Sequence, residues 1–266
     1  MSPTSFLERS FAYGARFAIA VRNLGFPGAL RTFIWIRGDS ELRSIYAPRL
    51  GRRIFFRSRA DKGVMSHFFY PGTKILDTPE NRVKVIVDAG ANAGMETIRL
   101  RHFHPDARVL SIEPDSGNYS VLQKNAEQDK GFVETMQNGL WSSEIPLRVF
   151  PGTTNEAFSV RPAEDGEASD IDAITLNAIL ARVGGEIDIL KMDIEGSEYE
   201  VFSKNTEWVS HVKAFIFECP DVDHVGTTAQ IFRTLGDLPF DTAVSGENIV
   251  LIRRDTGWSV ATTAYL

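Results

Sequence analysis

Residues 83–94 read Val-Lys-Val-Ile-Val-Asp-Ala-Gly-Ala-Asn-Ala-Gly. The opening residues are nearly all β-branched, which is typical of a strand buried on both faces of a parallel sheet. A turn containing two glycines follows, and a helix is predicted to begin near Gly94. A strand, a glycine turn and a helix in this order indicate an open α/β sheet with helices on both faces.

The alternation of strands and helices continues toward the C-terminus. Further strands are predicted over residues 108–112, 133–141, 187–192 and 213–217. Helices are predicted near residues 116, 198 and 228–235, and an antiparallel hairpin over residues 240–253. Residues 142–170 are rich in Gly, Pro, Ser and acids and are interpreted as an excursion with a hairpin that could face a substrate. Together the elements predict a mostly parallel Rossmann-like sheet that ends in an antiparallel hairpin.

The N-terminal part of the chain differs from this pattern. The sequence reads as helical from residue 6 to about residue 30, and the helix is expected to end around Gly-Phe-Pro-Gly at residues 25–28. Residues 52–57 read as a strand. We therefore expect an N-terminal helical and strand extension over residues 1–80. A main domain is expected over residues 81–266.

Charge is distributed unevenly along the 266 residues, whose formal net charge is −6. Residues 1–60 contain eleven arginines, no lysine and three acids, so this segment is basic and the remainder is acidic. The whole-chain charge argues against nucleic-acid binding. The basic segment could pair subunits in an oligomer, dock on the acidic body or meet a membrane surface, although membrane contact is not expected.

Two further features bear on location. The apolar run over residues 11–21 is interrupted by an arginine and is too short to cross a bilayer. The lone Cys219 cannot form an internal disulfide, which fits a reducing compartment. A cytoplasmic location is therefore expected.

The residues at the strand ends indicate the type of ligand, because ligands of open α/β sheets bind beyond the carboxyl ends of the strands. Gly90 and Gly94 permit a tight turn and close approach, but their spacing is not the G-x-G-x-x-G dinucleotide fingerprint. Asp88 would repel a pyrophosphate and favour a cationic ligand such as S-adenosylmethionine, which carries a sulfonium and an ammonium group. Glu113 follows Gly90 by 23 residues and is suited to accept two ribose hydroxyls. The pattern predicts a site for a cationic, nucleoside-bearing cofactor.

Four segments are similar to those of one known family: residues 88–94, 112–114, 122–125 and 190–198. They resemble the FkbM-type family of S-adenosylmethionine-dependent methyltransferases, over roughly residues 84–220. Residues 190–198, Leu-Lys-Met-Asp-Ile-Glu-Gly-Ser-Glu, are the most specific part. The resemblance implies a class I methyltransferase fold with a seven-stranded sheet. It also implies methyl transfer from S-adenosylmethionine to a hydroxyl of a sugar, glycan or natural-product acceptor.

The resemblance further implies roles for single residues. The methionine part of the cofactor would be held by Asp88, Gly90, Asn92 and Gly94. Glu113 would bind the ribose, and Asn138, at the end of the third strand, would lie near the adenine.

Acidic side chains follow the fourth and fifth strands, where the methyl group should point. Methyl transfer to a hydroxyl requires alignment of two atoms and acceptance of a proton, and a carboxylate in a dehydrated cleft could accept it. Asp193 and Glu195 are the first candidates; on an extended backbone they would face opposite sides, so that only one touches substrate. Glu218 is a further candidate, whereas Glu198 is interpreted as a first-turn acid that favours the helix dipole. Nothing in the spacing requires a metal, although Asp193 and Glu218 could share a divalent ion.

Other functions stay open on the sequence alone. A scaffold protein could bind the cofactor without catalysis, and nitrogen or carboxyl groups could be the methyl acceptors. A nicotinamide-dependent oxidoreductase is disfavoured because the third glycine spacing is missing. The identity of the acceptor cannot be read from any motif.

Overall fold

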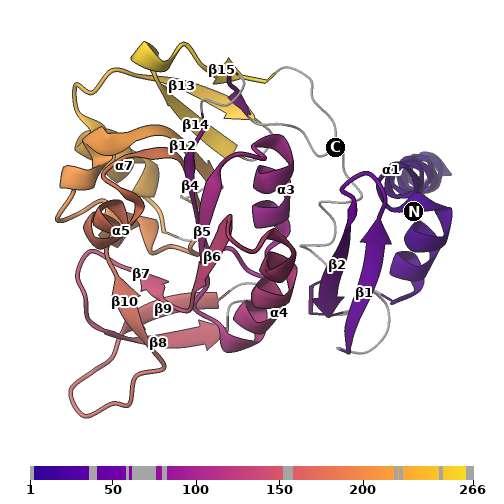
Figure 1. Ribbon diagram of the computed structural model, residues 1–266, viewed down its shortest axis with the longest axis horizontal. Helices are drawn as coiled ribbons and strands as arrows, with labels where there is room; N and C mark the ends of the chain where they lie inside the picture. The colour runs from indigo at the N-terminus through magenta and orange to yellow at the C-terminus, as the bar shows by residue number, and fades with distance from the viewer. Residues whose placement is uncertain are drawn as a thin grey trace. The chain divides into compact units, whose positions relative to one another are not determined.

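A computed structural model describes residues 3–35, 41–57, 60–61, 76–79, 83–151, 158–218, 221, 224–245 and 248–261. The chain divides into two compact units, one of residues 1–74 with 263–266 and one of residues 75–262. Each unit is described here by itself (Figure 1). Cys219 lies outside the described residues.

The first unit consists of a long helix and a hairpin. Helix α1 (Pro3–Trp35) is interrupted at Gly25, whose φ of 71° and ψ of 160° are not helical. The helix was expected to end near residues 25–28; it is interrupted there but continues to Trp35. The hairpin is formed by β1 (Leu42–Ala47) and β2 (Arg52–Arg57), which pair antiparallel. One face of the hairpin buries Ile45, Ala47, Ile54 and Phe56. No helix in the described part of the chain is both long and apolar enough to cross a membrane.

The second unit is built on a seven-stranded sheet. Its strands are β4 (Val85–Ala89), β5 (Arg108–Ile112), β6 (Val133–Met136), β11 (Ile187–Met192), β12 (Val212–Glu218), β13 (Phe240–Ser245) and β14 (Asn248–Arg253). They lie in the order β13-β14-β12-β11-β4-β5-β6, and β14 alone runs against the others. The predicted α/β fold, a mostly parallel seven-stranded sheet with a terminal antiparallel hairpin, is confirmed.

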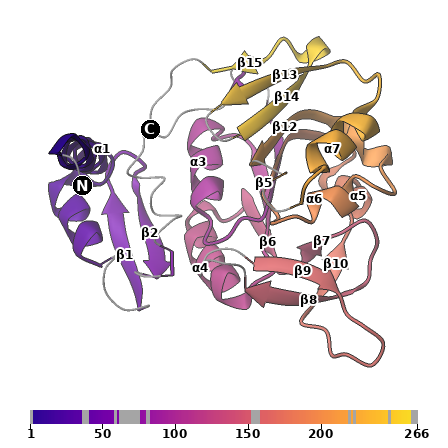
Figure 2. The same cartoon turned by 180° about the vertical axis from the view of Figure 1, so that it is seen from behind.

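Helices cover both faces of this sheet (Figures 1 and 2). Helices α3 (Met95–Phe103) and α4 (Ser116–Ala126) lie on one side, and α5 (Leu176–Val183), α6 (Glu198–Val201) and α7 (Thr227–Leu235) on the other. Strand residues alternate between two apolar clusters, because successive side chains point to opposite faces. Val87 packs with α5 and α7, whereas its neighbour Ile86 packs with Leu100 of α3.

Short elements complete the second unit. Three 3₁₀ turns are η1 (Glu127–Asp129), η2 (Glu207–His211) and η3 (Arg254–Thr256). Strands β3 (Leu76–Asp77) and β15 (Ser259–Val260) pair antiparallel.

A second, four-stranded sheet lies between β6 and β11 in the sequence. It consists of β7 (Gly139–Leu140), β8 (Pro146–Pro151), β9 (Phe158–Pro162) and β10 (Ile171–Ile174), in the order β7-β10-β8-β9. The expected hairpin in this region is therefore present as β8 and β9. The prediction of one strand over residues 133–141 was wrong, because β7 leaves the large sheet and pairs with β10 instead.

The order of the strands decides where a ligand can bind. From the central strand β4 the chain adds β5 and β6 on one side, and only later adds β11 on the other. A crevice therefore opens at the carboxyl ends of β4 and β11, the switch point at which open α/β sheets bind ligands.

Candidate active site

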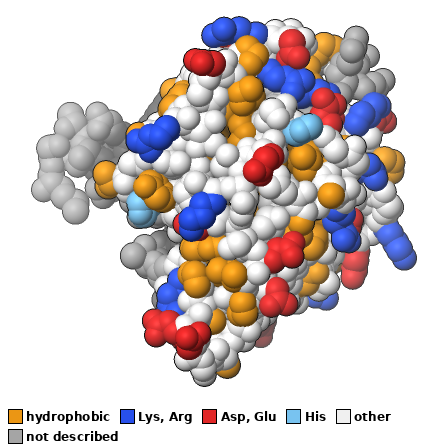
Figure 3. Space-filling view, turned by 90° about the vertical axis from the view of Figure 1, so that its left-hand side faces the viewer, with side chains coloured by type: hydrophobic (Ala, Val, Ile, Leu, Met, Phe, Trp, Pro, Cys, Tyr) orange, Lys and Arg blue, Asp and Glu red, His pale blue; other side chains and the backbone are white. Residues whose placement is uncertain are grey.

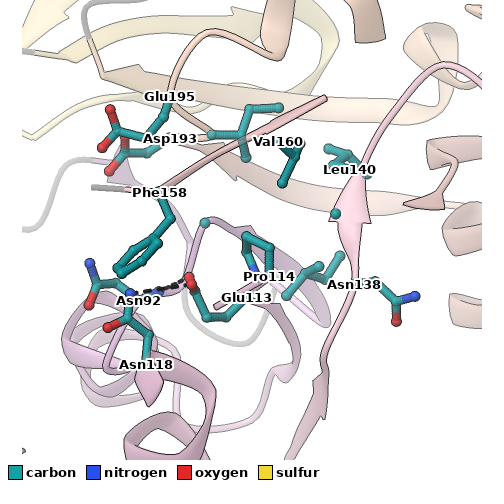
Figure 4. A pocket seen from close by; sticks show the side chains of 14 residues that line it. Asn92, Glu113, Pro114, Asn118, Asn138, Leu140, Phe158, Val160, Asp193 and Glu195 are labelled. Atoms are coloured by element: carbon teal, nitrogen blue, oxygen red, sulfur yellow. Dashed lines mark hydrogen bonds between the residues drawn. The ribbon is translucent and has the colours of Figure 1, made fainter. Parts of the chain in front are cut away.

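A pocket lies at this switch point, where residues after three strands converge (Figure 4). Gly90 and Asn92 come from the turn after β4, Glu113 directly follows β5, and Asp193 follows β11. The four-stranded sheet supplies an apolar wall of Leu140, Phe158 and Val160. Of the residues that the sequence singles out at strand ends, these four lie together in the pocket.

The turn after β4 requires glycine at its first bend. Gly90 has a φ of +73°, and a Cβ built on it would lie 1.7 Å from the carbonyl oxygen of Asp193. The amide N–H groups of Gly90 and Ala91 both donate to the carbonyl oxygen of Ile112, at 3.0 and 2.9 Å. The turn is therefore held against the end of β5 and packed against the loop after β11.

The second glycine of the motif has a packing role. Gly94 precedes α3 with a φ of +85°, and a Cβ there would lie 2.8 Å from Cδ1 of Leu122 in α4. The side-chain amide of Asn125 donates to the carbonyl oxygen of Ala93 at 2.8 Å. Gly94 itself is not among the residues that line the pocket.

Glu113 connects the turn after β4 with the start of α4. Its Oε2 accepts the amide N–H of Asn92 at 2.8 Å, and its Oε1 accepts the amide N–H of Asp115 at 3.0 Å. The side-chain amide of Asn118 also donates to Oε1, at 3.3 Å. Burial raises the pKa of the Glu113 carboxyl to about 7, although these hydrogen bonds work in the opposite direction. Glu113 is thus a buried acid at the pocket that titrates near neutral pH.

Asp88 is fully buried and does not line the pocket. The hydroxyl of Thr97 donates to its Oδ2 at 2.6 Å, and Nζ of Lys191 lies 3.6 Å from its Oδ1. Burial raises the pKa of the Asp88 carboxyl, opposed by the Lys191 ammonium. Because this cation offsets its charge, Asp88 does not carry the cation-favouring field that its position in the sequence suggests.

Asp193 and Glu195 both line the pocket, and Figure 4 shows their carboxylates on the same side of it. The expectation that they face opposite sides was wrong. It assumed an extended backbone, but β11 ends at Met192 and Glu195 adopts a left-handed conformation with φ of 53°. Two acids therefore face the space next to the turn after β4.

The family model for the FkbM methyltransferase domain matches residues 88–225, which is more than half of the chain and includes every pocket wall described above. The chain belongs to the FkbM methyltransferase domain family. Methyltransferase sdnD from Sordaria araneosa is 29% identical over 161 residues, covering 48% of this chain and 61% of that protein. Methyltransferase 1 from Beauveria bassiana is 28% identical over 139 residues, covering 44% of this chain and 56% of that protein.

The chain spans about three fifths of the length of these curated relatives. Among solved structures, the methyltransferase FkbM from Methylobacillus flagellatus aligns with a TM-score of 0.46 and 19% identity. That alignment covers 64% of this chain and 43% of the other.

Two further acids of the FkbM domain differ in their placement from Asp193. Glu198 is buried, and its two carboxylate oxygens accept the amide N–H groups of Ile194 at 2.8 Å and Gly196 at 3.0 Å. Burial raises the pKa of the Glu198 carboxyl to about 7. Glu198 therefore holds the backbone of the loop that carries Asp193 and Glu195. Glu218 ends β12 with an exposed side chain and is not among the pocket-lining residues.

Asn138 lines the edge of the FkbM pocket, but its side-chain amide donates to the carbonyl oxygen of Asp172 at 3.0 Å. Figure 4 shows this side chain directed away from the pocket. Asn118, Phe158 and Val160 line the same pocket and were not singled out in the sequence. The hairpin expected over residues 142–170 was the only signal for the last two.

The described residues include no group of three or more His, Cys, Asp or Glu side chains placed to hold a metal ion. Asp193 and Glu218, which could have shared a divalent ion, are not both in the pocket.

Proposed function

We propose that this chain is an S-adenosylmethionine-dependent methyltransferase that acts on a hydroxyl of a sugar, glycan or natural-product acceptor. The observation that carries the proposal is the convergence of the Gly90 turn, Glu113 and Asp193 on one pocket at the switch point of the sheet. Membership of the FkbM family supports methyl transfer. The acceptor class rests on the family resemblance.

The residues present fit the cofactor. Glu113 is an acceptor at the end of β5, and an ionised carboxylate offers about four acceptor positions. Protein donors occupy three of these, two on Oε1 and one on Oε2. One position on Oε2 is left for a ribose hydroxyl, which is one fewer than the two that the sequence predicts. The apolar wall of Leu140 and Val160 suits an adenine ring.

When bound, S-adenosylmethionine supplies a methyl group activated by its sulfonium. Transfer of this methyl group to a hydroxyl would release the hydroxyl proton, which a group of the protein would have to accept. We assign this role to Asp193 or Glu195, because both line the pocket and a carboxylate can accept a proton. The side chain of Asp193 is 34% exposed, so it remains accessible to an acceptor.

The proposal is tested first by calorimetric titration of the full chain with S-adenosylmethionine and with S-adenosylhomocysteine. Saturable binding of both is expected, and absence of heat at millimolar ligand would refute the proposal. Incubation with isotopically labelled S-adenosylmethionine and a cell extract, followed by mass spectrometry, then identifies the acceptor. Label on a hydroxyl oxygen supports the proposal. Label on nitrogen or on a carboxyl group would show that the proposed acceptor class is wrong.

Once an acceptor is known, Asp193→Asn is expected to lower turnover by about a hundredfold or more, because the proton acceptor is lost. Affinity for S-adenosylhomocysteine should change much less. The control is Asp241→Asn, since Asp241 is a surface acid on β13 that does not line the pocket. Normal turnover in Asp193→Asn would contradict its role, and binding of the cofactor without transfer to any acceptor would favour a non-catalytic scaffold.

A further inference from the structure

Lys191 carries a charged group into the interior of the second unit, next to the pocket. It lies on β11 and is 8% exposed. Its Nζ donates to the carbonyl oxygen of Gly90 at 2.9 Å. The same nitrogen lies 3.6 Å from Oδ1 of Asp88 and 3.5 Å from Oδ2 of Asp193. The ammonium thus has one hydrogen bond, to the backbone of the turn, and two carboxylates at ion-pair distance.

These partners keep the ammonium charged. Burial works to lower the pKa of Lys191, but the surrounding carboxylates, Asp193 and Asp88 first among them and Glu96 and Glu218 with them, together raise the pKa above its ordinary value. A buried charge is tolerated only when it is paired and hydrogen-bonded. Lys191 therefore stays positive across the physiological pH range.

The two walls of the pocket meet at this nitrogen. The amide N–H of Asp193 donates to the carbonyl oxygen of Ala89 at 3.1 Å, and Gly90 has no room for a Cβ because Asp193 is so close. Lys191 contacts the carbonyl oxygen of Gly90 in the turn after β4 and the carboxylate of Asp193 in the loop after β11. A shift of the Lys191 side chain would therefore affect both loops.

The two acids around Lys191 differ in what they face. Asp88 is fully buried, and its Oδ1 has no hydrogen bond in the structure, so the nearby ammonium is its main compensation. Asp193 is partly exposed and lines the pocket. Lys191 thus compensates the buried acid while it also forms an ion pair with the acid at the pocket.

We propose that Lys191 is a positioning residue of the methyl-transfer site: it locks the Gly90 turn and aims the Asp193 carboxylate at the cofactor's sulfonium. The inference rests on the proposed function, since it assigns to Asp193 the place next to the reacting methyl group. It goes beyond that function because it makes cofactor affinity depend on a residue that is not among those lining the pocket.

The test begins with binding, which needs no acceptor. Lys191→Met removes the ammonium at similar length, and Lys191→Met/Asp88→Asn also removes the buried acid that would otherwise lack its cation. Both variants are expected to bind S-adenosylmethionine and S-adenosylhomocysteine about tenfold or more weakly, because a charged hydrogen bond to the turn is lost.

Lys213→Met is the matched control. Lys213 lies on the neighbouring strand β12 and is also ion-paired, with Asp188 and Glu186 at 2.7 Å each. It lies at the amino end of its strand, whereas the pocket is at the carboxyl ends. The Lys213→Met variant should bind both ligands within about twofold of the unmodified chain. Thermal unfolding of each variant verifies that affinities are compared between folded proteins.

A double-mutant cycle separates positioning from a general structural role. Asp193→Asn is combined with Lys191→Met/Asp88→Asn, and affinities for both ligands are measured. If Lys191 acts through Asp193, the loss caused by Asp193→Asn should shrink about threefold or more in the Lys191-free background with S-adenosylmethionine. With S-adenosylhomocysteine, whose sulfur is uncharged, the coupling should be smaller.

The outcomes are distinguishable. Folded Lys191 variants with unchanged affinity, or additive effects for S-adenosylmethionine, would overturn the role of Lys191 while the proposed function stands. If the unmodified chain binds neither ligand, the proposed function fails, and the role of Lys191 fails with it.

Discussion

At the pocket, residues with unusual backbone conformations are held by buried carboxylates. Asn92 and Glu195 are non-glycine residues with positive φ, 50° and 53°, and each lies in one of the two loops that form the pocket. Such conformations are unfavourable and persist where surrounding contacts hold them. Glu113 binds the amide of Asn92, and Glu198 binds the amides on both sides of Glu195. Each strained residue thus has a buried carboxylate that fixes it.

Glu113 should make cofactor affinity depend on pH. Its pKa of about 7 means that it is mostly protonated at pH 6 and mostly ionised at pH 8. The ionised form is the better acceptor for a ribose hydroxyl, so affinity for S-adenosylhomocysteine should rise up to about tenfold over this range. Calorimetry at both pH values measures it.

Two variants check this assignment. Glu113→Ala should weaken binding, because the acceptor is lost, and Glu113→Gln should bind weakly with little dependence on pH. A pH dependence that persists unchanged in Glu113→Gln would assign the titration to another group.

Burial of Glu113 also makes the stability of the fold depend on pH, in the direction opposite to that expected for cofactor affinity. Because the folded pKa of Glu113 lies above the ordinary value of 4.5, its contribution to stability is fully present below pH 4.5. That contribution is lost as pH rises through about 7. Binding at this residue is therefore expected to improve in the range in which its contribution to folding declines.

At the scale of elements, an aromatic cluster supports the loop after β11. Phe202 directly follows the short helix α6 and is fully buried. Its ring centroid lies 5.0 Å from that of Trp208 and 5.7 Å from that of Phe217 on β12. Helix α6 has four residues, too few to be stable alone, so this packing holds it in place.

Phe202→Ala should lower the free energy of unfolding by about 3–5 kcal/mol, because a large buried ring is lost and a cavity remains. Urea denaturation measures the change. Phe232→Ala is the control, since Phe232 lies on α7 with 42% of its surface exposed and should cost much less. Equal losses in the two variants would show that the cluster does not stabilise the fold in this way.

The elements that the sequence predicts best are the buried parallel strands. Strands β5 and β11 have the predicted bounds, because runs of β-branched and aliphatic residues end at polar strand-end residues. The segment 133–141 was predicted as one strand because alternation alone cannot show that it is shared between two sheets. Helix α5 was missed because it is short and follows directly on β10.

Some residues of the site can likewise be predicted from the sequence, and others only from the fold. Gly90, Glu113 and Asp193 were predictable, since each follows a buried strand and strand ends form the ligand site. Phe158 reaches the pocket through the pairing of β8 with β9; the sequence predicts a hairpin in this region but not which of its side chains line the pocket. Lys191 stands inside an apolar run, and only the fold shows that three oxygens surround it.

At the scale of the whole molecule, charge is uneven along the chain. Figure 3 shows that on one face Lys and Arg side chains are nevertheless interspersed with Asp and Glu. The arginines of the first 60 residues belong to the first unit, whereas the residues that line the pocket belong to the second. The basic segment and the pocket are therefore parts of different units.

Removal of residues 1–74 is expected to leave affinity for S-adenosylhomocysteine within about twofold, because the described residues that line the pocket all belong to the second unit. Calorimetry on the shortened, folded chain measures this, with circular dichroism to verify folding. A large loss of affinity in a folded variant would show that the first unit contributes to the site. Loss of acceptor methylation alone would instead assign the first unit to the acceptor.

The four-stranded sheet has a consequence for how such a protein can diversify. It contributes Phe158 and Val160 to the pocket, yet among the described residues its strands do not pair with those of the large sheet. Substitutions or length changes there can reshape one wall while the register of β4, β5 and β11 stays intact. Members of one lineage would thus differ in the shape of this wall, while the strands that precede Gly90, Glu113 and Asp193 are inherited unaltered.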